Sequence, residues 1–150
     1  MTAGEVFGVN RGALAIFILT LISFAASVAV ITVPPFTELL SGSPLFLLPF
    51  GIFFFLSAAL FIKAYKGDLS GKLRGFLLLT GGSGAGVFLR ILLHNFIYGL
   101  FIYAFGEGIW GGVGGDEPFF FILGLIVCPI GYVVGSLGTL YLTFARSKAK

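Results

Sequence analysis

The chain has 150 residues, of which 58% are hydrophobic and 10% are charged, and its formal net charge is +3. A soluble domain carries about 25% charged residues, so this composition excludes an ordinary soluble domain and favours an integral membrane protein. The chain contains one cysteine and one histidine. It therefore cannot form an intrachain disulfide or a two-histidine metal or haem site, and we expect no metal and no cofactor.

The first apolar stretch, residues 13–33, contains 21 residues and no charge. At 1.5 Å per residue, a helix of this length is about 30 Å long and crosses a bilayer core. Pro34 and Pro35 follow the stretch and predict the end of the helix. A cleaved signal peptide with Ser27-Val28-Ala29 at its cleavage site is the alternative. We favour an uncleaved helix, because signal peptides have apolar runs of only about 7–15 residues.

Three further apolar stretches predict three more helices, at residues 45–64, 75–105 and 119–144. None shows the alternating pattern of an outer-membrane barrel strand. The third stretch has 31 residues, and a helix of that length is about 46 Å long, well beyond a 30 Å core. It either continues as one helix that tilts or protrudes, or breaks at the glycine cluster 81–86. The prediction is an all-α integral membrane protein with four transmembrane helices in a single domain, residues 1–150.

The charged residues predict the orientation of these helices. With four spans, eight basic residues fall on one side of the membrane: Arg11, Lys63, Lys66, Lys72, Arg74, Arg146, Lys148 and Lys150. Four acidic residues fall on the other side: Glu38, Glu107, Asp116 and Glu117. The positive-inside rule then predicts a cell-membrane protein with both termini in the cytoplasm. Anionic lipids of the inner leaflet are the expected partners of the basic side, and nucleic acid is not.

A polar stripe runs along the third span. Ser83, Arg90, His94 and Tyr98 share one face of a helix, and Asn95 borders that face. In a continuous helix Arg90 lies near mid-bilayer, where an arginine costs about 2.5–3.5 kcal/mol on insertion scales. The compensating group would be a carbonyl, a lipid phosphate, a bound anion or an acid from another subunit. In a broken helix Arg90 lies about 9 Å from the inner end and snorkels to the cytoplasm.

Small residues recur at helical spacing in the third and fourth spans. In the fourth span they follow steps of four and three, at Gly124, Cys128, Gly131, Gly135 and Gly138. Gly82 and Gly86 repeat the small-xxx-small pattern on the third span. Such patterns let helices approach closely, so we expect a tight helix contact within the chain or between subunits.

The sequence contains no Walker-type loop and no GxSxG, HExxH or CxxC motif. This argues against an enzyme, and we assign no catalytic residues. The leading hypothesis is an accessory or structural subunit that packs through its glycine seams with itself or with a partner in a membrane complex. The alternative is a small oligomeric channel or transporter for an anion or small solute, using the Arg90 and His94 stripe. A lipid-modifying enzyme is the third hypothesis.

Overall fold

A computed structural model describes residues 11–67, 69, 71–106 and 122–148 of the chain. Residues 119–121 of the fourth predicted span lie outside this part, as do five of the acidic residues and Lys150. The side chains of Arg146 and Lys148 are likewise not described. The acidic residues concerned are Glu5, Asp68, Glu107, Asp116 and Glu117.

Every element in the described part is helical. In chain order the elements are α1 (Arg11–Thr32), α2 (Pro34–Leu40), a 3-10 turn η1 (Pro44–Leu47), α3 (Leu48–Lys66), α4 (Gly71–Phe105), a π-helical turn η3 (Leu123–Val127) and α6 (Cys128–Lys148). Four helical segments are long and apolar enough to cross a membrane, namely Arg11–Thr32, Pro44–Lys66, Gly71–Phe105 and Leu123–Ala145. The prediction of an all-helical chain with four such segments is confirmed.

Prolines set the helix boundaries between α1 and α3. Val33 is extended, with φ −101° and ψ 106°, because the residue before a proline avoids the helical region. Pro34 and Pro35 then occupy the first turn of α2. A proline is tolerated there because N–H groups of the first turn have no acceptor within the helix. The Thr37 hydroxyl donates to the Val30 carbonyl at 2.7 Å. The double proline therefore ends α1 as predicted, but it also starts a short helix that the sequence analysis did not predict.

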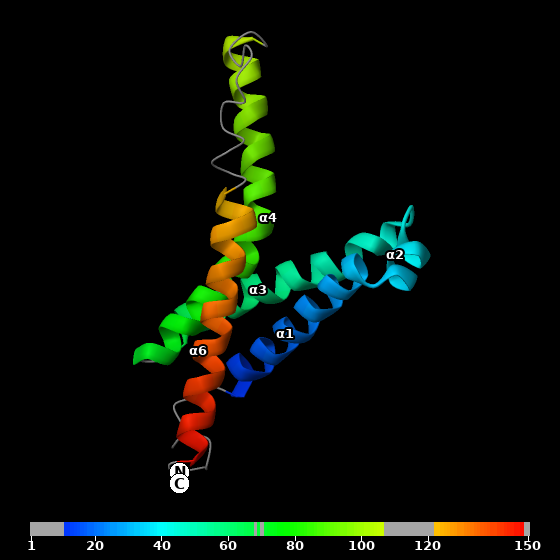
Figure 1. Cartoon of the computed structure of the whole chain (residues 1–150). Helices are drawn as coiled ribbons and strands as arrows, with labels where there is room; N and C mark the ends of the chain where they lie inside the picture. Colours follow the sequence, from blue (N-terminus) through cyan, green and yellow to red (C-terminus); the bar gives the residue numbers. More distant parts are fainter. Residues whose placement is uncertain (1–10, 68, 70, 107–121, 149–150) are drawn as a thin grey trace.

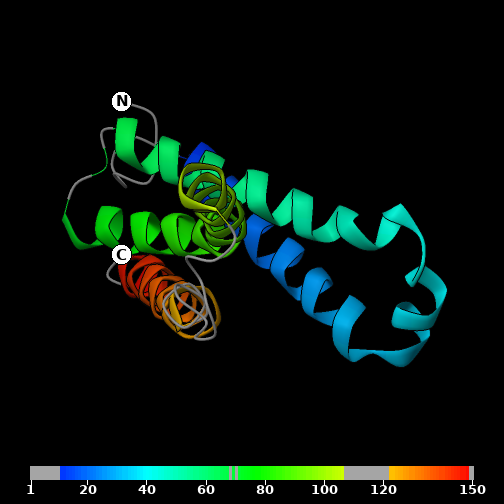
Figure 2. The ribbon, with the colours of Figure 1, turned by 90° about the horizontal axis from the view of Figure 1, so that it is seen from above.

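The four long helices form two antiparallel hairpins, α1 with α3 and α4 with α6, and α3 also packs against α4 (Figures 1 and 2). The hairpins diverge, so that α2 and the C-terminal end of α4 lie far apart (Figure 1). A buried apolar cluster joins them near the start of α1, the end of α3 and the start of α4. Its members are Ala13, Phe17, Leu60, Ala64, Leu69, Leu73 and Leu77.

Helix α4 is continuous over 35 residues, with no break at the glycine cluster 81–86. At 1.5 Å per residue it is about 52 Å long. Its axis bends in the middle, so that its first half runs alongside α3 and its second half stands along the direction of α6 (Figures 1 and 2). Of the two alternatives left open by the sequence, the structure has the continuous helix.

Besides the apolar cluster, the helix contacts bury polar side chains, and many large apolar side chains lie on the outside. Hydroxyl residues from all four long helices are buried: Thr20, Ser23, Ser27, Ser57, Thr80, Ser136 and Thr139. Several donate to the carbonyl four residues earlier in their own helix, as Thr20 does to Ile16 at 2.8 Å. Many large apolar side chains lie on the outside of the helices, with Phe55 71% and Leu137 61% exposed. Soluble domains bury such side chains.

Candidate functional site

The small residues of α6 pack against α4 within the chain. A Cβ atom at Gly135 would lie 2.7 Å from the Thr80 nitrogen and 3.0 Å from the Phe76 oxygen, both backbone atoms. Contact residues that follow one another toward the C-terminus of α6 face residues that follow one another toward the N-terminus of α4, as expected for antiparallel helices. The facing pairs are Gly124 with Arg90, Cys128 with Gly86, Gly131 with Ser83, Gly135 with Thr80, and Gly138 with Phe76. We call this contact the α4–α6 seam.

A second close contact, between α3 and α4, involves glycines that the sequence analysis did not select. A Cβ atom at Gly81 would lie 2.6 Å from the Phe61 nitrogen, and one at Gly84 would lie 2.9 Å from the Ser57 Cβ. Gly82 meets only the Phe61 ring, at 3.4 Å, whereas Gly86 faces Cys128 of α6. The expected pair of Gly82 and Gly86 therefore faces two different helices. The three-residue spacing of Gly81 and Gly84 is the signal that could have identified the α3 contact.

Arg90 lies half-buried in the α4–α6 seam, against Gly124. A Cβ atom at Gly124 would collide with the Arg90 side chain, so the glycine provides the space that the guanidinium occupies. Gly124 belongs to the π-helical turn η3, in which the Cys128 N–H donates to the Leu123 carbonyl. In a helix the Gly124 carbonyl would accept from the N–H of residue 128 or 129. The Cys128 N–H already donates to Leu123, and Pro129 has no N–H. The widened turn lies directly before α6, where Arg90 packs against Gly124, and π turns of this kind occur often at functional sites.

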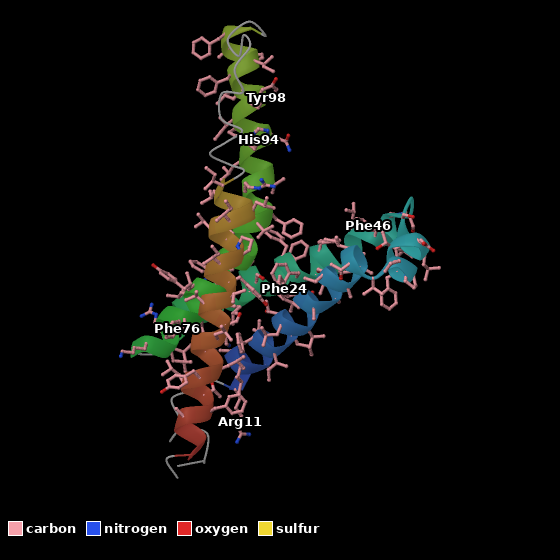
Figure 3. The ribbon with its side chains drawn as sticks, viewed as in Figure 1. Arg11, Phe24, Phe46, Phe76, His94 and Tyr98 are labelled. Atoms are coloured by element: carbon pink, nitrogen blue, oxygen red, sulfur yellow. The ribbon has the colours of Figure 1, made fainter. Side chains whose placement is uncertain are left out.

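The remaining residues of the polar stripe lie on the second half of α4. The rings of His94 and Tyr98 stack with their centroids 6.1 Å apart (Figure 3). His94 is half-buried, while Asn95 and Tyr98 are exposed. The structure therefore divides the predicted stripe: Ser83 and Arg90 face α6, and Asn95 and Tyr98 face outward.

Basic side chains gather at the end of the molecule that holds the apolar cluster. Arg11, Lys63, Lys66 and Lys72 are exposed there, and Arg74 is half-buried. We call these five residues the basic end. Within the described residues the one acid is Glu38, which lies on α2 at the opposite end of α1.

No group of three histidine, cysteine or acidic side chains that could hold a metal occurs in the part of the chain that the structure describes. The Cys128 thiol is free and buried in the seam. The described residues thus form helices, four of them long and apolar, and this arrangement is compatible with a small membrane protein. Comparison with families of proteins, with curated proteins and with solved structures gives no match for this chain.

Proposed function

We propose that this chain is a four-span membrane protein that resides in the cell membrane. The observation that carries the proposal is the outward surface, on which many large apolar side chains are exposed, while hydroxyls and glycines lie in the helix contacts beside the buried apolar cluster. In lipid, helix association relies on small residues that allow close approach and on polar side chains that form hydrogen bonds across helices. In water, the same outward surface would drive aggregation.

The basic end supports an orientation with both termini in the cytoplasm. Arg11 at the start of α1 shares this end with Lys63 and Lys66 of α3. Positive residues that flank membrane helices favour the cytoplasmic side, and Glu38 lies at the other end.

Within the membrane, the best-supported role is that of a structural or accessory subunit. Contacts inside the chain occupy the α4–α6 seam, so a partner chain would meet an outward apolar face instead. Exposed apolar residues follow one another every three or four residues from the end of η3 along α6 and form one such face. They are Val127, Ile130, Val134, Leu137 and Tyr141. Spacing of this kind forms the seam of packed helix pairs.

An oligomeric channel or transporter for an anion or small solute is the second candidate. It is favoured by the position of Arg90, a cationic side chain held half-buried between two apolar helices. Intramembrane ionisable residues commonly mark solute paths. In this case a second copy of the chain would cover Asn95 and Tyr98, and the path would run along the stripe between copies.

Native mass spectrometry of the full chain, extracted gently from its own membrane, distinguishes these roles. A foreign chain at fixed stoichiometry is the result expected for a subunit. A homo-oligomer would instead support the channel, and anion flux should then fall in Arg90→Ala while the oligomer persists. A lone monomer would contradict both roles and leave the membrane location to be tested separately.

A further inference from the structure

The corner between α3 and α4 carries four basic side chains. Lys63 and Lys66 lie in the last turn of α3, and Lys72 and Arg74 lie in the first turn of α4. Leu69 and Leu73 are 4% and 2% exposed and anchor this corner in the apolar cluster. The basic groups are therefore fixed to the end of the helix bundle.

Arg74 differs from the lysines because its guanidinium contacts Tyr65 of the same chain. Its Nη2 atom donates to the Tyr65 carbonyl at 2.9 Å. Its guanidinium carbon lies 6.0 Å from the centre of the Tyr65 ring. This contact joins the first turn of α4 to a carbonyl of the last turn of α3, where helices lack internal partners. The three lysines at the corner are exposed, so their ammonium groups face outward around this fixed contact.

We propose that Lys63, Lys66 and Lys72 form a binding surface for the headgroups of anionic phospholipids. This inference rests on the proposed membrane location, because the end of α3 then lies at the depth of the lipid phosphates. Lysine stems lie along apolar surface while their ammonium groups reach the interface. The Tyr65 side chain, 63% exposed between the lysines, is the kind of aromatic residue that lies at headgroup level.

The test compares lipids retained by the full chain after reconstitution into vesicles of mixed phosphatidylcholine and phosphatidylglycerol, measured by native mass spectrometry. The test variant is K63Q/K66Q/K72Q. The matched control, R11Q/R146Q/K148Q, removes the same number of positive charges, at other positions on the same predicted side of the membrane. One near-surface basic residue changes anionic-lipid binding about fivefold. We therefore expect the excess of retained phosphatidylglycerol over phosphatidylcholine to fall at least about fivefold in the test variant. The control should keep most of this excess.

Two results would overturn the inference: retention of phosphatidylglycerol by the test variant as by the parent, or an equal loss in the control. Displacement of the lipid by inorganic phosphate, beyond that by chloride at equal ionic strength, would also overturn it in favour of a free-phosphate site. Vesicle flotation and circular dichroism are scored first for all three proteins. Failure of the parent chain to float with vesicles would instead contradict the membrane location itself.

Discussion

Gly135 determines how closely α6 approaches α4. A Cβ atom there would lie 2.7 Å from the Thr80 nitrogen and 3.0 Å from the Phe76 oxygen. Both are backbone atoms of a continuous helix, so neither can move aside as the tip of a side chain does. The glycine is therefore required by the contact and not by its own backbone flexibility.

Gly135→Ala is expected to lower the free energy of unfolding by about 1–3 kcal/mol, the usual cost of overpacking. Gly75→Ala is the matched control, because α4 leaves open space around Gly75. That variant should be neutral or gain up to about 1 kcal/mol, since alanine favours helix over glycine. Reversible unfolding in mixed micelles with increasing dodecyl sulfate, followed by circular dichroism, measures both. Equal stability of the two variants would show that the seam is not tightly packed.

The sequence predicted the residues of the α4–α6 seam better than those of the α3 contact. The spacing of small residues from Gly124 to Gly138 fits one face of one helix, so it could be recognised without a partner. The cluster at 81–86 has glycines on several faces, and only the packing of α3 on one side and α6 on the other assigns them. Arg90 was recognised as a candidate, but its place against Gly124 depends on η3.

At the scale of the elements, the four apolar helices were predictable because runs of about 20 apolar residues form helices that satisfy their own backbone groups. Helix α2 and the π turn were not, because they arise where prolines remove N–H donors. Pro34 begins a new helix, and Pro129 lies two residues after the end of a widened turn. The periodicity of apolar residues in the sequence indicates neither the start of α2 nor the π turn.

Tyr132 links the two hairpins. Its hydroxyl donates to the Thr20 carbonyl of α1 at 3.3 Å. Its ring lies 4.7 Å from that of Phe24 and 5.3 Å from that of Phe53, centre to centre. One side chain of α6 thus contacts both helices of the other hairpin.

Tyr132→Phe should keep the ring cluster and lose the hydrogen bond, lowering the free energy of unfolding by about 0.5–1.5 kcal/mol. Tyr141 lies on the same helix and is 72% exposed. Tyr141→Phe should therefore change the free energy of unfolding very little. The dodecyl sulfate titration provides the comparison. If the Tyr141 variant loses as much stability as the Tyr132 variant, the hydroxyl of Tyr132 does not hold the hairpins together.

At the scale of the whole molecule, two features agree. Large apolar side chains cover the outside of the helices, and the basic end is separated from Glu38 by the length of α1. Both follow if the helices cross a bilayer with the basic end in the cytoplasm. The sequence alone indicated the charge separation, but the burial of the hydroxyl residues and the outward position of many large apolar side chains required the structure.

The most direct test of this account is the labelling of single cysteines by a membrane-impermeant maleimide. Ser41 lies before the start of α3 and Lys66 is its last residue, and both positions are exposed. The single-cysteine variants are Ser41→Cys and Lys66→Cys, each with Cys128→Ala to remove the one native thiol. In intact spheroplasts that express the full chain, we expect S41C to be labelled and K66C to be labelled only after lysis. Labelling of both without lysis, or protection of both, would show that α3 does not cross the membrane. Labelling of K66C alone would contradict the orientation.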